Sequence, residues 1–270
     1  MGMKKALLLT AIVATTGIAY YFLGDTAQAP APEMAAVAPL PVPQSAPVVP
    51  LPAEPLVRYP IEVAAVAVEK PTLPELDNSD SALGTALTKL FGKKTFRAYF
   101  YPDKMIRRFV ATIDNLPRHE APAQMMPVKP VGGSFLVKRS ETGSTVDPAN
   151  DRRYLRYLNV MSSADVRQLV DLYIGLYPVF QQAYRELGYP KGYFNDRLIE
   201  ALDDLLATPE LAPPLVLQQP KVLYQFADPA LESRSAGQKI MLRLGADNMA
   251  RAKAVLKAIR TEVLSRSSPK

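Results

Sequence analysis

The stretch ADVRQLVDLYIGLYPVFQQAYREL, residues Ala164–Leu187, has the strongest helical pattern in the chain. Its large apolar residues recur at intervals of three and four, which places them on one face of a helix. They are Leu169, Tyr173, Leu176, Tyr177, Phe180, Tyr184 and Leu187. The pattern predicts one long helix, with Ser162 and Asp165 as a capping pair at its start. Pro178 lacks an amide hydrogen, so we expect it to kink this helix, and we expect Gly188 to end it.

Shorter helical patterns lie on both sides of this stretch. They predict helices over Ser81–Leu90, Pro102–Asn115, Asp147–Val160 and Ala236–Leu244, one from Asn195 or Phe194 to Leu206, a restart of helix at Asp228-Pro229, and a last helix from Asp247 to Leu264. Ser235 and Gln238 are expected to form a second capping box, and Asp247 is expected to cap the last helix. Short extended segments are expected at Ser134–Lys138, Leu215–Leu217 and Val222–Tyr224. The predicted fold class is therefore mainly α, a multi-helix globular domain with one or two short β pairs.

The first residues of the chain predict a membrane anchor. Lys4 and Lys5 precede the uncharged apolar run Ala6–Leu23, which is just long enough to cross a bilayer core. The positive-inside rule then places residues 1–5 in the cytoplasm and the rest of the chain on the periplasmic side of a bacterial inner membrane. A cleaved signal peptide is one competing interpretation, because Ala27–Ala29 fits a small-x-small cleavage pattern. A buried helix of a soluble protein is the other. We favour the uncleaved single-pass anchor, since the apolar run is longer than the usual signal core.

Residues 24–74 predict a flexible, disordered tether. They are rich in Pro, Ala and Val and contain too few large apolar groups to form a core. Such a sequence tends toward polyproline II, which rises about 3.1 Å per residue. We interpret it as a spacer, because proline content alone indicates no specific receptor. The folded periplasmic domain is expected over 75–266, with 267–270 as a disordered tail.

Composition excludes several classes of chemistry. The 270 residues include no Cys and a single His, His119. Disulfides, thiolate nucleophiles and zinc–thiolate sites are therefore excluded, and a multi-histidine metal site or a Ser-His-Asp triad has little material. We expect no catalytic residue, no metal and no cofactor. The formal net charge of +6 suits an anionic partner such as lipid headgroups or a cell-wall polymer.

Several separated segments are similar to a known family. They are FVATIDNLPR (Phe109–Arg118), YRELGYP (Tyr184–Pro190), YFNDRL (Tyr193–Leu198), KVLYQFADP (Lys221–Pro229) and SAGQK (Ser235–Lys239). In this order they resemble a family of bacterial proteins classified only as a domain of unknown function, over about Leu73–Leu264. The resemblance implies a single-pass anchored protein with a Pro-rich tether, and it implies no activity and no catalytic residues.

A basic and aromatic segment, Lys89–Arg108, is the first candidate binding site. Its basic residues outnumber its single acid, and aromatic residues lie between them. The candidate partner-binding residues here are Lys93, Lys94, Arg97, Arg107 and Arg108. This composition suits an anionic glycan, a lipid surface or an acidic protein, and nucleic acid is not expected on the periplasmic side. The competing interpretation places the rings in the core and the bases on a solvated rim.

The turn that follows Gly188 is the second candidate. Tyr189, Tyr193, Phe194 and Arg197 belong to residue types that are enriched at binding hot spots. An exposed recognition patch is one interpretation of the turn, and packing of its rings in the core is the other. His119 has no partner nearby in the sequence, and we interpret it as an ordinary surface residue.

A third feature is the acidic stripe Asp196, Glu200, Asp203 and Asp204, which shares one face of the predicted helix. Carboxylates of this kind are able to bind calcium or magnesium, but no second segment is evident to close such a site. We interpret the stripe as a solvated face.

These patterns together favour a binding module rather than an enzyme. The expected function is a membrane-anchored protein whose periplasmic domain binds another envelope protein or an anionic cell-wall component. A carboxylate-based hydrolase of cell-wall glycan is one alternative, and it requires two carboxyls about 5–10 Å apart across a cleft. An accessory subunit of a larger membrane complex is the other.

Overall fold

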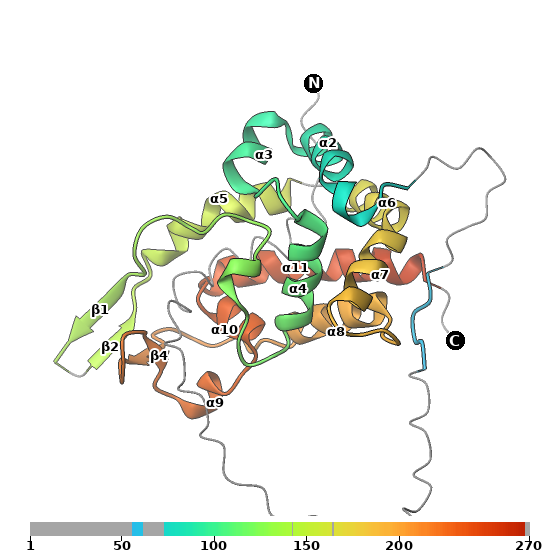
Figure 1. Ribbon diagram of the computed structural model, residues 1–270. Coiled ribbons are helices and arrows are strands. Elements are labelled where there is room, and N and C mark those ends of the chain that lie inside the picture. Colours follow the sequence, from blue (N-terminus) through green and yellow to red (C-terminus); the bar gives the residue numbers. More distant parts are fainter. Residues whose placement is uncertain (1–55, 62–72, 142, 164, 268–270) are drawn as a thin grey trace, which may run out of the picture.

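The computed structural model describes residues 56–61, 73–141, 143–163 and 165–267. Helices make up most of this part of the chain, and one small sheet projects from it (Figure 1). The helices are α2 (Ser79–Phe91), α3 (Lys93–Tyr99), α4 (Met105–Asn115), α5 (Asn150–Ser162), α6 (Val166–Gly175), α7 (Tyr177–Glu186), α8 (Phe194–Leu206), α9 (Pro229–Glu232), α10 (Ala236–Leu242) and α11 (Ala246–Ser265), with short 3-10 turns at Leu76–Asn78 and Ala123–Met125. The strands are β1 (Val137–Ser140), β2 (Gly143–Val146), β3 (Val216–Gln218) and β4 (Gln225–Phe226). The mainly helical fold class is confirmed.

A break at Leu176 divides the predicted long helix into α6 and α7. Pro178 lies in the first turn of α7, where its missing amide hydrogen leaves no helical hydrogen bond unmade. The expected single kinked helix is therefore wrong, because the chain ends one helix and starts another before the proline. The Asp165 side chain caps α6 by accepting from the amides of Arg167 and Gln168 at 3.1 and 3.3 Å. Ser162 is the last residue of α5 and takes no part in this cap.

The start of α4 also differs from the prediction, which placed it at Pro102. Lys104 adopts a left-handed conformation with φ 52°, which is not helical. The helix therefore begins after Lys104, at Met105. The side chain of Asp80 in α2 accepts from the amides of Lys104 and Met105 at 2.6 and 2.8 Å. A side chain 24 residues upstream therefore satisfies the first amides of α4, and a local pattern does not reveal this.

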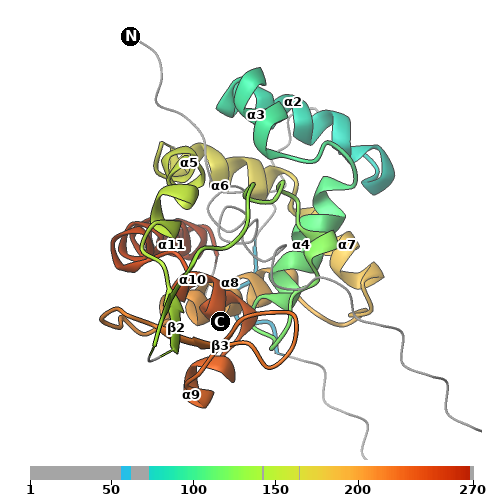
Figure 2. The same ribbon diagram turned by 90° about the vertical axis from the view of Figure 1, so that its left-hand side faces the viewer.

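Rings from four helices meet in the centre of the core. Phe180 of α7 lies 5.5 Å from Phe109 of α4, 5.4 Å from Tyr173 of α6 and 6.0 Å from Phe194 of α8, between ring centroids. All four are almost completely buried. The long helix α11 packs against α5, α6 and α8 and closes the other side of this core (Figures 1 and 2). These contacts hold α4, α7 and α8 together, and they build the site described below.

The strands form one four-stranded antiparallel sheet in the order β1-β2-β3-β4. Expected strands at Ser134–Lys138 and Val222–Tyr224 are displaced to β1 and β4, which begin three residues later in each case. A separate small core of Leu217, Phe226 and Leu242 lies under the sheet. The displacement follows from this packing, because Phe226 is the buried residue of its strand whereas Val222 is exposed.

Helix caps near the carboxyl end agree in part with the sequence. Asp228 caps α9, and the Ser235 hydroxyl accepts from the amide of Gln238 at 3.0 Å at the start of α10. Asp247 lies in the first turn of α11 but is not its cap; Gly245 holds that position with φ 84°. The left-handed conformation there requires a residue without a side chain.

Gly245→Ala is expected to lower the free energy of unfolding by about 1–3 kcal/mol, because alanine is strained at this φ. A Cβ would also lie 2.3 Å from a carboxylate oxygen of Asp151. Urea denaturation of the two proteins measures the difference. Gly132→Ala is the matched control, since a Cβ there meets nothing within 4 Å, and equal stability of the two variants would contradict this account.

The described part of the expected tether lies against the domain. The amides of Arg58 and Tyr59 donate to the Asp196 carboxylate at 2.9 and 2.8 Å, which gives these backbone groups partners within the fold. Ile61 forms a β-bridge with Ser267, a residue that the sequence placed in a disordered tail. Residues 56–61 and Ser267 therefore belong to the folded unit.

The predicted membrane span 6–23 and the rest of the expected tether lie outside the described residues. Among the helices that the structure does describe, none combines the length and the apolar character needed to cross a bilayer.

Candidate functional site

A groove of about 590 Å³ opens between the end of α4, the α7–α8 turn, the start of α8 and the segment 56–61. Its size lies within the usual range for ligand sites. It is lined by Leu56, Arg58, Asp114, Pro117, Arg118, Tyr184, Tyr189, Tyr193, Asp196, Arg197 and Glu200. We call it the tyrosine–arginine groove.

Asp114 lies at the base of this groove, in the last turn of α4, with a side chain only 5% exposed. Its carboxylate accepts from Arg118 Nη2 at 2.8 Å, from Arg197 Nε at 3.1 Å and from the Tyr189 hydroxyl at 3.1 Å. The Tyr189 hydroxyl in turn accepts from Arg118. One buried acid therefore holds two arginines and a tyrosine from three different parts of the chain in a fixed arrangement.

Arg197 is the more deeply placed of the two arginines, with its side chain 14% exposed. It also donates to the backbone carbonyl of Asp114 and pairs with Glu200 at 2.9 Å. Burial lowers the pKa of Arg197, but the hydrogen bond and charge of Glu200 and the charge of Asp114 outweigh burial and raise its pKa overall. The guanidinium is therefore a permanent cation in the wall of the groove.

Tyrosine rings form the apolar part of the wall. Tyr184 and Tyr189 stack with their centroids 4.6 Å apart and their planes 18° apart. Burial raises the pKa of Tyr184 to about 12, so its hydroxyl stays protonated at neutral pH. Position 192 requires a glycine, because a Cβ on Gly192 would lie 2.8 Å from the Tyr184 ring and 2.8 Å from the Tyr189 Cβ. The stacked pair is thus built into the turn.

Two further contacts secure the other rim. The Tyr193 hydroxyl accepts from the amide of Ile61 at 2.6 Å, and Asn195 donates to the carbonyl of Tyr59 at 2.8 Å. Asn195 is fully buried and also contacts the Tyr173 hydroxyl at 3.1 Å. The segment that carries Leu56 and Arg58 into the groove is therefore tied to the core rather than only resting on the surface.

Comparison with protein families identifies the region that contains most of this groove. The model of a family described as "Protein of unknown function (DUF3014)" matches residues 105–260, more than half of the chain. The chain belongs to the DUF3014 family. No curated protein and no solved structure matches it.

The DUF3014 match begins at the first residue of α4 and ends inside α11. It includes Asp114, Arg118, the three tyrosines and Arg197, whereas Leu56 and Arg58 lie outside it. Helices α2 and α3 also precede the match. The family region thus supplies the buried acid, its arginines and the rings of the groove.

Three of the four residues expected in the turn after Gly188 line this groove. Tyr189 and Arg197 bind Asp114 there, and Tyr193 lines the same groove. Phe194, expected in an exposed patch, is instead completely buried. It is the first residue of α8, and its ring packs on Phe180 in the centre of the core, so it is not available to a partner.

The basic and aromatic segment is divided by the fold. Arg107 bonds Asp77 and Glu186, and Arg108 bonds Asp103 and lies 5.1 Å from the Tyr101 ring centroid. Both arginines are therefore occupied within the domain. Phe100 is buried, and the other rings of the segment are partly buried. Lys93, Lys94 and Arg97 remain exposed on α3 and do not belong to the groove lining.

The acidic stripe does not form a metal site in the described part of the chain, where no group of three or more metal-binding side chains converges. Each carboxylate has its own partner. Asp196 holds the segment 56–61, Glu200 pairs with Arg197, Asp203 with Arg260, and Asp204 with Ser235 and Gln238. Burial raises the pKa of Asp204, against the lowering effect of its two hydrogen bonds.

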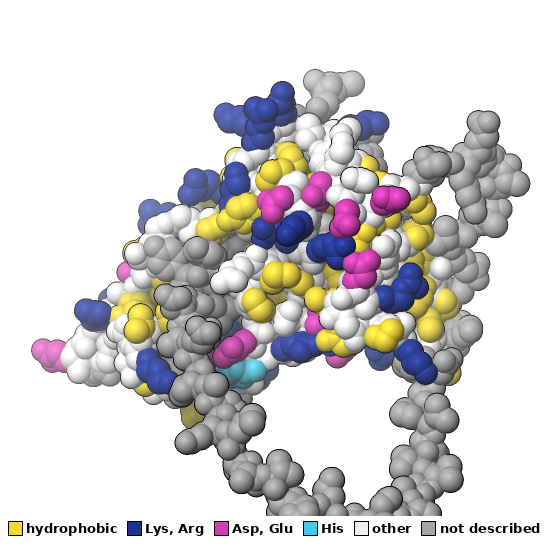
Figure 3. All heavy atoms as spheres, in the orientation of Figure 1, with side chains coloured by type: hydrophobic (Ala, Val, Ile, Leu, Met, Phe, Trp, Pro, Cys, Tyr) yellow, Lys and Arg dark blue, Asp and Glu magenta, His cyan; other side chains and the backbone are white. Residues whose placement is uncertain are grey.

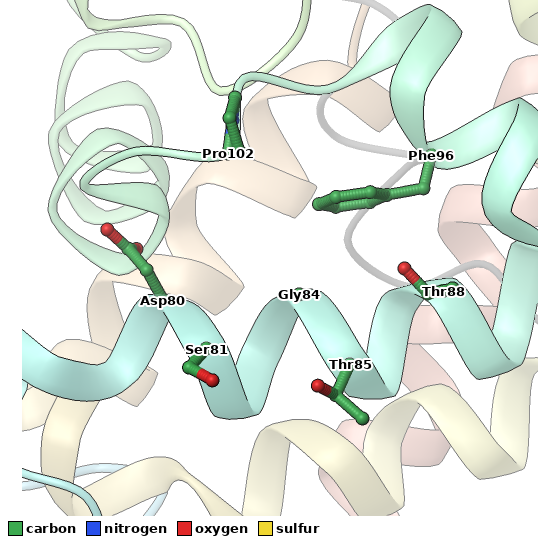
Figure 4. Close-up of a pocket in the computed structure, with 7 residues that line it drawn as sticks. All are labelled: Asp80, Ser81, Gly84, Thr85, Thr88, Phe96 and Pro102. Carbon is green, nitrogen blue, oxygen red and sulfur yellow. The ribbon is translucent and has the colours of Figure 1, made fainter.

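A second hollow, of about 420 Å³, lies between α2 and the segment that follows it (Figure 4). The Phe96 ring lies above α2, and a Cβ on Gly84 would meet it at 3.5 Å (Figure 4). Ser81, Thr85 and Thr88 supply only hydroxyls, and both oxygens of Asp80 are taken by the start of α4. This hollow therefore holds less polar chemistry than the tyrosine–arginine groove.

Asp114, Arg118 and Arg58 were not singled out from the sequence. Asp114 lies in a mostly apolar stretch at the end of α4, and an acid on a buried face is a signal that a partner must be near. The spacing of four to Arg118 was visible in the sequence, but Arg197 is 83 residues away. His119 is exposed, in agreement with its interpretation as a surface residue.

Proposed function

We propose that this chain is a membrane-anchored binding module and that the tyrosine–arginine groove is its binding face. In this proposal residues 6–23 hold the chain in the bacterial inner membrane, and the domain lies on the periplasmic side. The groove accepts an acidic, extended segment of another envelope protein. The observation that supports this most is the buried Asp114, which fixes Arg118 and Arg197 beside a stack of tyrosine rings.

The residue types of the groove support binding. Tyr and Arg are the residues that most often dominate the energy of protein interfaces. Here they are held before any partner arrives, so that less side-chain freedom is lost on association. The side chain of Arg118 is 48% exposed while one edge is bound to Asp114, so the guanidinium remains accessible from the groove. A carboxylate on the partner is its natural counterpart.

The state of the acids supports binding over glycan hydrolysis. Asp114 and Glu200 both pair with Arg197 and are therefore near one another, as two catalytic carboxyls would be. A general acid must deliver a proton to the substrate, however, and the Asp114 oxygens are already occupied by Arg118, Arg197 and Tyr189. Asp196 is likewise engaged by backbone amides.

Site-specific photo-crosslinking in cells tests the proposal. A photoreactive residue replaces Pro117, on the groove rim, in the full-length protein, and a second protein carries it at exposed Lys257 on α11. We expect the rim position to capture one dominant envelope protein that the α11 position does not capture. Arg118→Glu should abolish this capture, because the new carboxylate repels an acidic partner while Asp114 keeps Arg197.

The controls separate the partner from background. The crosslinked protein must fractionate with the membrane, and Arg185→Glu, which reverses an exposed cation outside the groove lining, should leave the capture unchanged. Capture of the same proteins from both positions, or capture that persists in Arg118→Glu, would exclude the groove as the binding face.

A further inference from the structure

A cluster of positive charge lies on α2 and α3 and has no part in the groove. The sequence from Ser81 to Pro102 contains four basic residues and no acid. They are Lys89, Lys93, Lys94 and Arg97, all exposed. In Figure 3, Lys and Arg side chains gather at the top of the molecule, over α3. We call these four residues the basic corner.

The cations of the basic corner differ from the other basic residues nearby. Arg107 and Arg108 are held by acids, as described above. None of the four corner residues forms an ion pair with any residue that the structure describes. A fifth cation, the ammonium of Lys129, donates to the carbonyl of Arg97 at 2.6 Å and adds to the charge at this edge. The field of the corner is therefore not neutralised within the described domain.

The glycine between α2 and α3 and the aromatic rings under them hold the basic corner in a fixed shape. Gly92 joins α2 to α3 with φ 80°, a conformation that lets the chain turn sharply between the two helices. The rings of Phe91 and Phe96 pack on Phe100 at 5.2 and 5.6 Å between centroids. Because these rings face inward, the surface of the corner consists of cations and not of apolar side chains that could insert into a bilayer. The corner therefore suits an electrostatic contact with a charged surface better than insertion into the apolar part of a membrane.

We propose that the basic corner docks onto the anionic phospholipid headgroups of the membrane that anchors the chain. A flat, multiply anionic surface is complementary to several unpaired cations on one edge, and each contributes separately to the attraction. This inference rests on the anchor in the proposed function and adds a second contact with the same membrane. It does not depend on what the groove binds.

Docking in this way would orient the groove. Asp80, in the first turn of α2, binds the first residues of α4, so helix α2 lies at that end of α4. Asp114 lies in the last turn of α4, at its other end. In both ribbon views α3 is at the top and segment 56–61 lies well below it (Figures 1 and 2). The groove would then face away from the bilayer. The roughly 30 residues between the expected anchor and Leu56 reach about 100 Å if extended, which exceeds the size of the domain.

The test uses the full chain in lipid vesicles. The chain has no Cys, so Ala98→Cys in exposed α3 provides a single site for a donor dye, and the vesicles carry an acceptor lipid. We expect strong energy transfer in phosphatidylcholine vesicles that contain phosphatidylglycerol and weak transfer in phosphatidylcholine alone. Transfer should also fall in 1 M salt, where the screening length drops to about 3 Å.

Charge removal provides the matched comparison. Replacing Lys93, Lys94 and Arg97 with Gln should reduce the docked-to-undocked ratio by roughly 100-fold, at about fivefold for each cation. The control replaces three exposed cations elsewhere on the domain, Arg185, Lys221 and Lys257, with Gln. Circular dichroism confirms that both variants are folded.

Each outcome decides the proposal. Strong transfer on anionic vesicles that only the corner variant loses supports docking. Equal transfer on neutral vesicles, equal loss in both variants, or no transfer overturns it. Flotation of the vesicles in high salt tests the membrane anchor separately, because charge contacts are then screened. If the protein does not float with the vesicles in high salt, the proposed anchor is wrong. Energy transfer that falls with added salt still reports whether the basic corner docks onto the lipid surface.

Discussion

Asp114→Asn is expected to lower the free energy of unfolding by about 3 kcal/mol. The substitution keeps the shape of the side chain but removes the charge that compensates Arg197, whose side chain is 14% exposed. A buried ion pair that loses one partner leaves the other charge without compensation, which typically costs about 3–5 kcal/mol. Arg118 contributes less, because its side chain is 48% exposed and water solvates it.

Urea denaturation followed by circular dichroism measures this change. Glu186→Gln is the matched control: it also removes an acid from an arginine, but the Arg107–Glu186 pair lies at the surface and Arg107 keeps Asp77. We expect the control to have a urea midpoint close to that of the wild type. If Asp114→Asn does the same, the buried acid does not organise the groove, and the proposed binding face loses its main support.

Phe194→Ala is expected to cost about 3–5 kcal/mol of stability, the usual range for removing a fully buried ring. The side chain is 0% exposed and has rings on several sides, with Tyr184 at 5.5 Å and Phe180 at 6.0 Å between centroids. The cavity left behind lies where α4, α6, α7 and α8 meet, so these helices cannot collapse into it without separating from other neighbours.

The same experiment separates the two interpretations of the turn. If Phe194 formed an exposed recognition patch, its loss would weaken partner binding and leave the denaturation midpoint unchanged. Tyr193→Phe is the control in the same turn, since it removes only the hydroxyl that accepts from Ile61 and should have a much smaller effect. A normal midpoint for Phe194→Ala would contradict the buried position.

Most of the helices followed from local patterns. The restart of helix at Asp228-Pro229 and the cap at Ser235 were visible because a cap depends on residues within one turn of the helix. Pro178 also indicated an interruption of the helix near Leu176, but the sequence pattern could not show whether the helix would kink or end there. That choice depends on where α6 and α7 each find their packing partners.

The tyrosine–arginine groove was only partly visible in the sequence. Tyr189, Tyr193 and Arg197 stood out because they share one turn. Whether each ring would face the groove or the core depended on how α8 packs against α4 and α7. The turn placed Phe194 inward and Tyr193 at the rim, although the two are adjacent.

By itself, the sequence determined the mainly helical class, the absence of thiol chemistry and the expectation of an anchored chain, because each depends on composition or on neighbours a few residues apart. Only the tertiary structure decided the groove. Its central contact joins Asp114 to a residue 83 positions away, and its rim joins Arg58 to a residue 138 positions away. Such contacts form when helices pack, and packing is a property of the whole core that no local pattern contains.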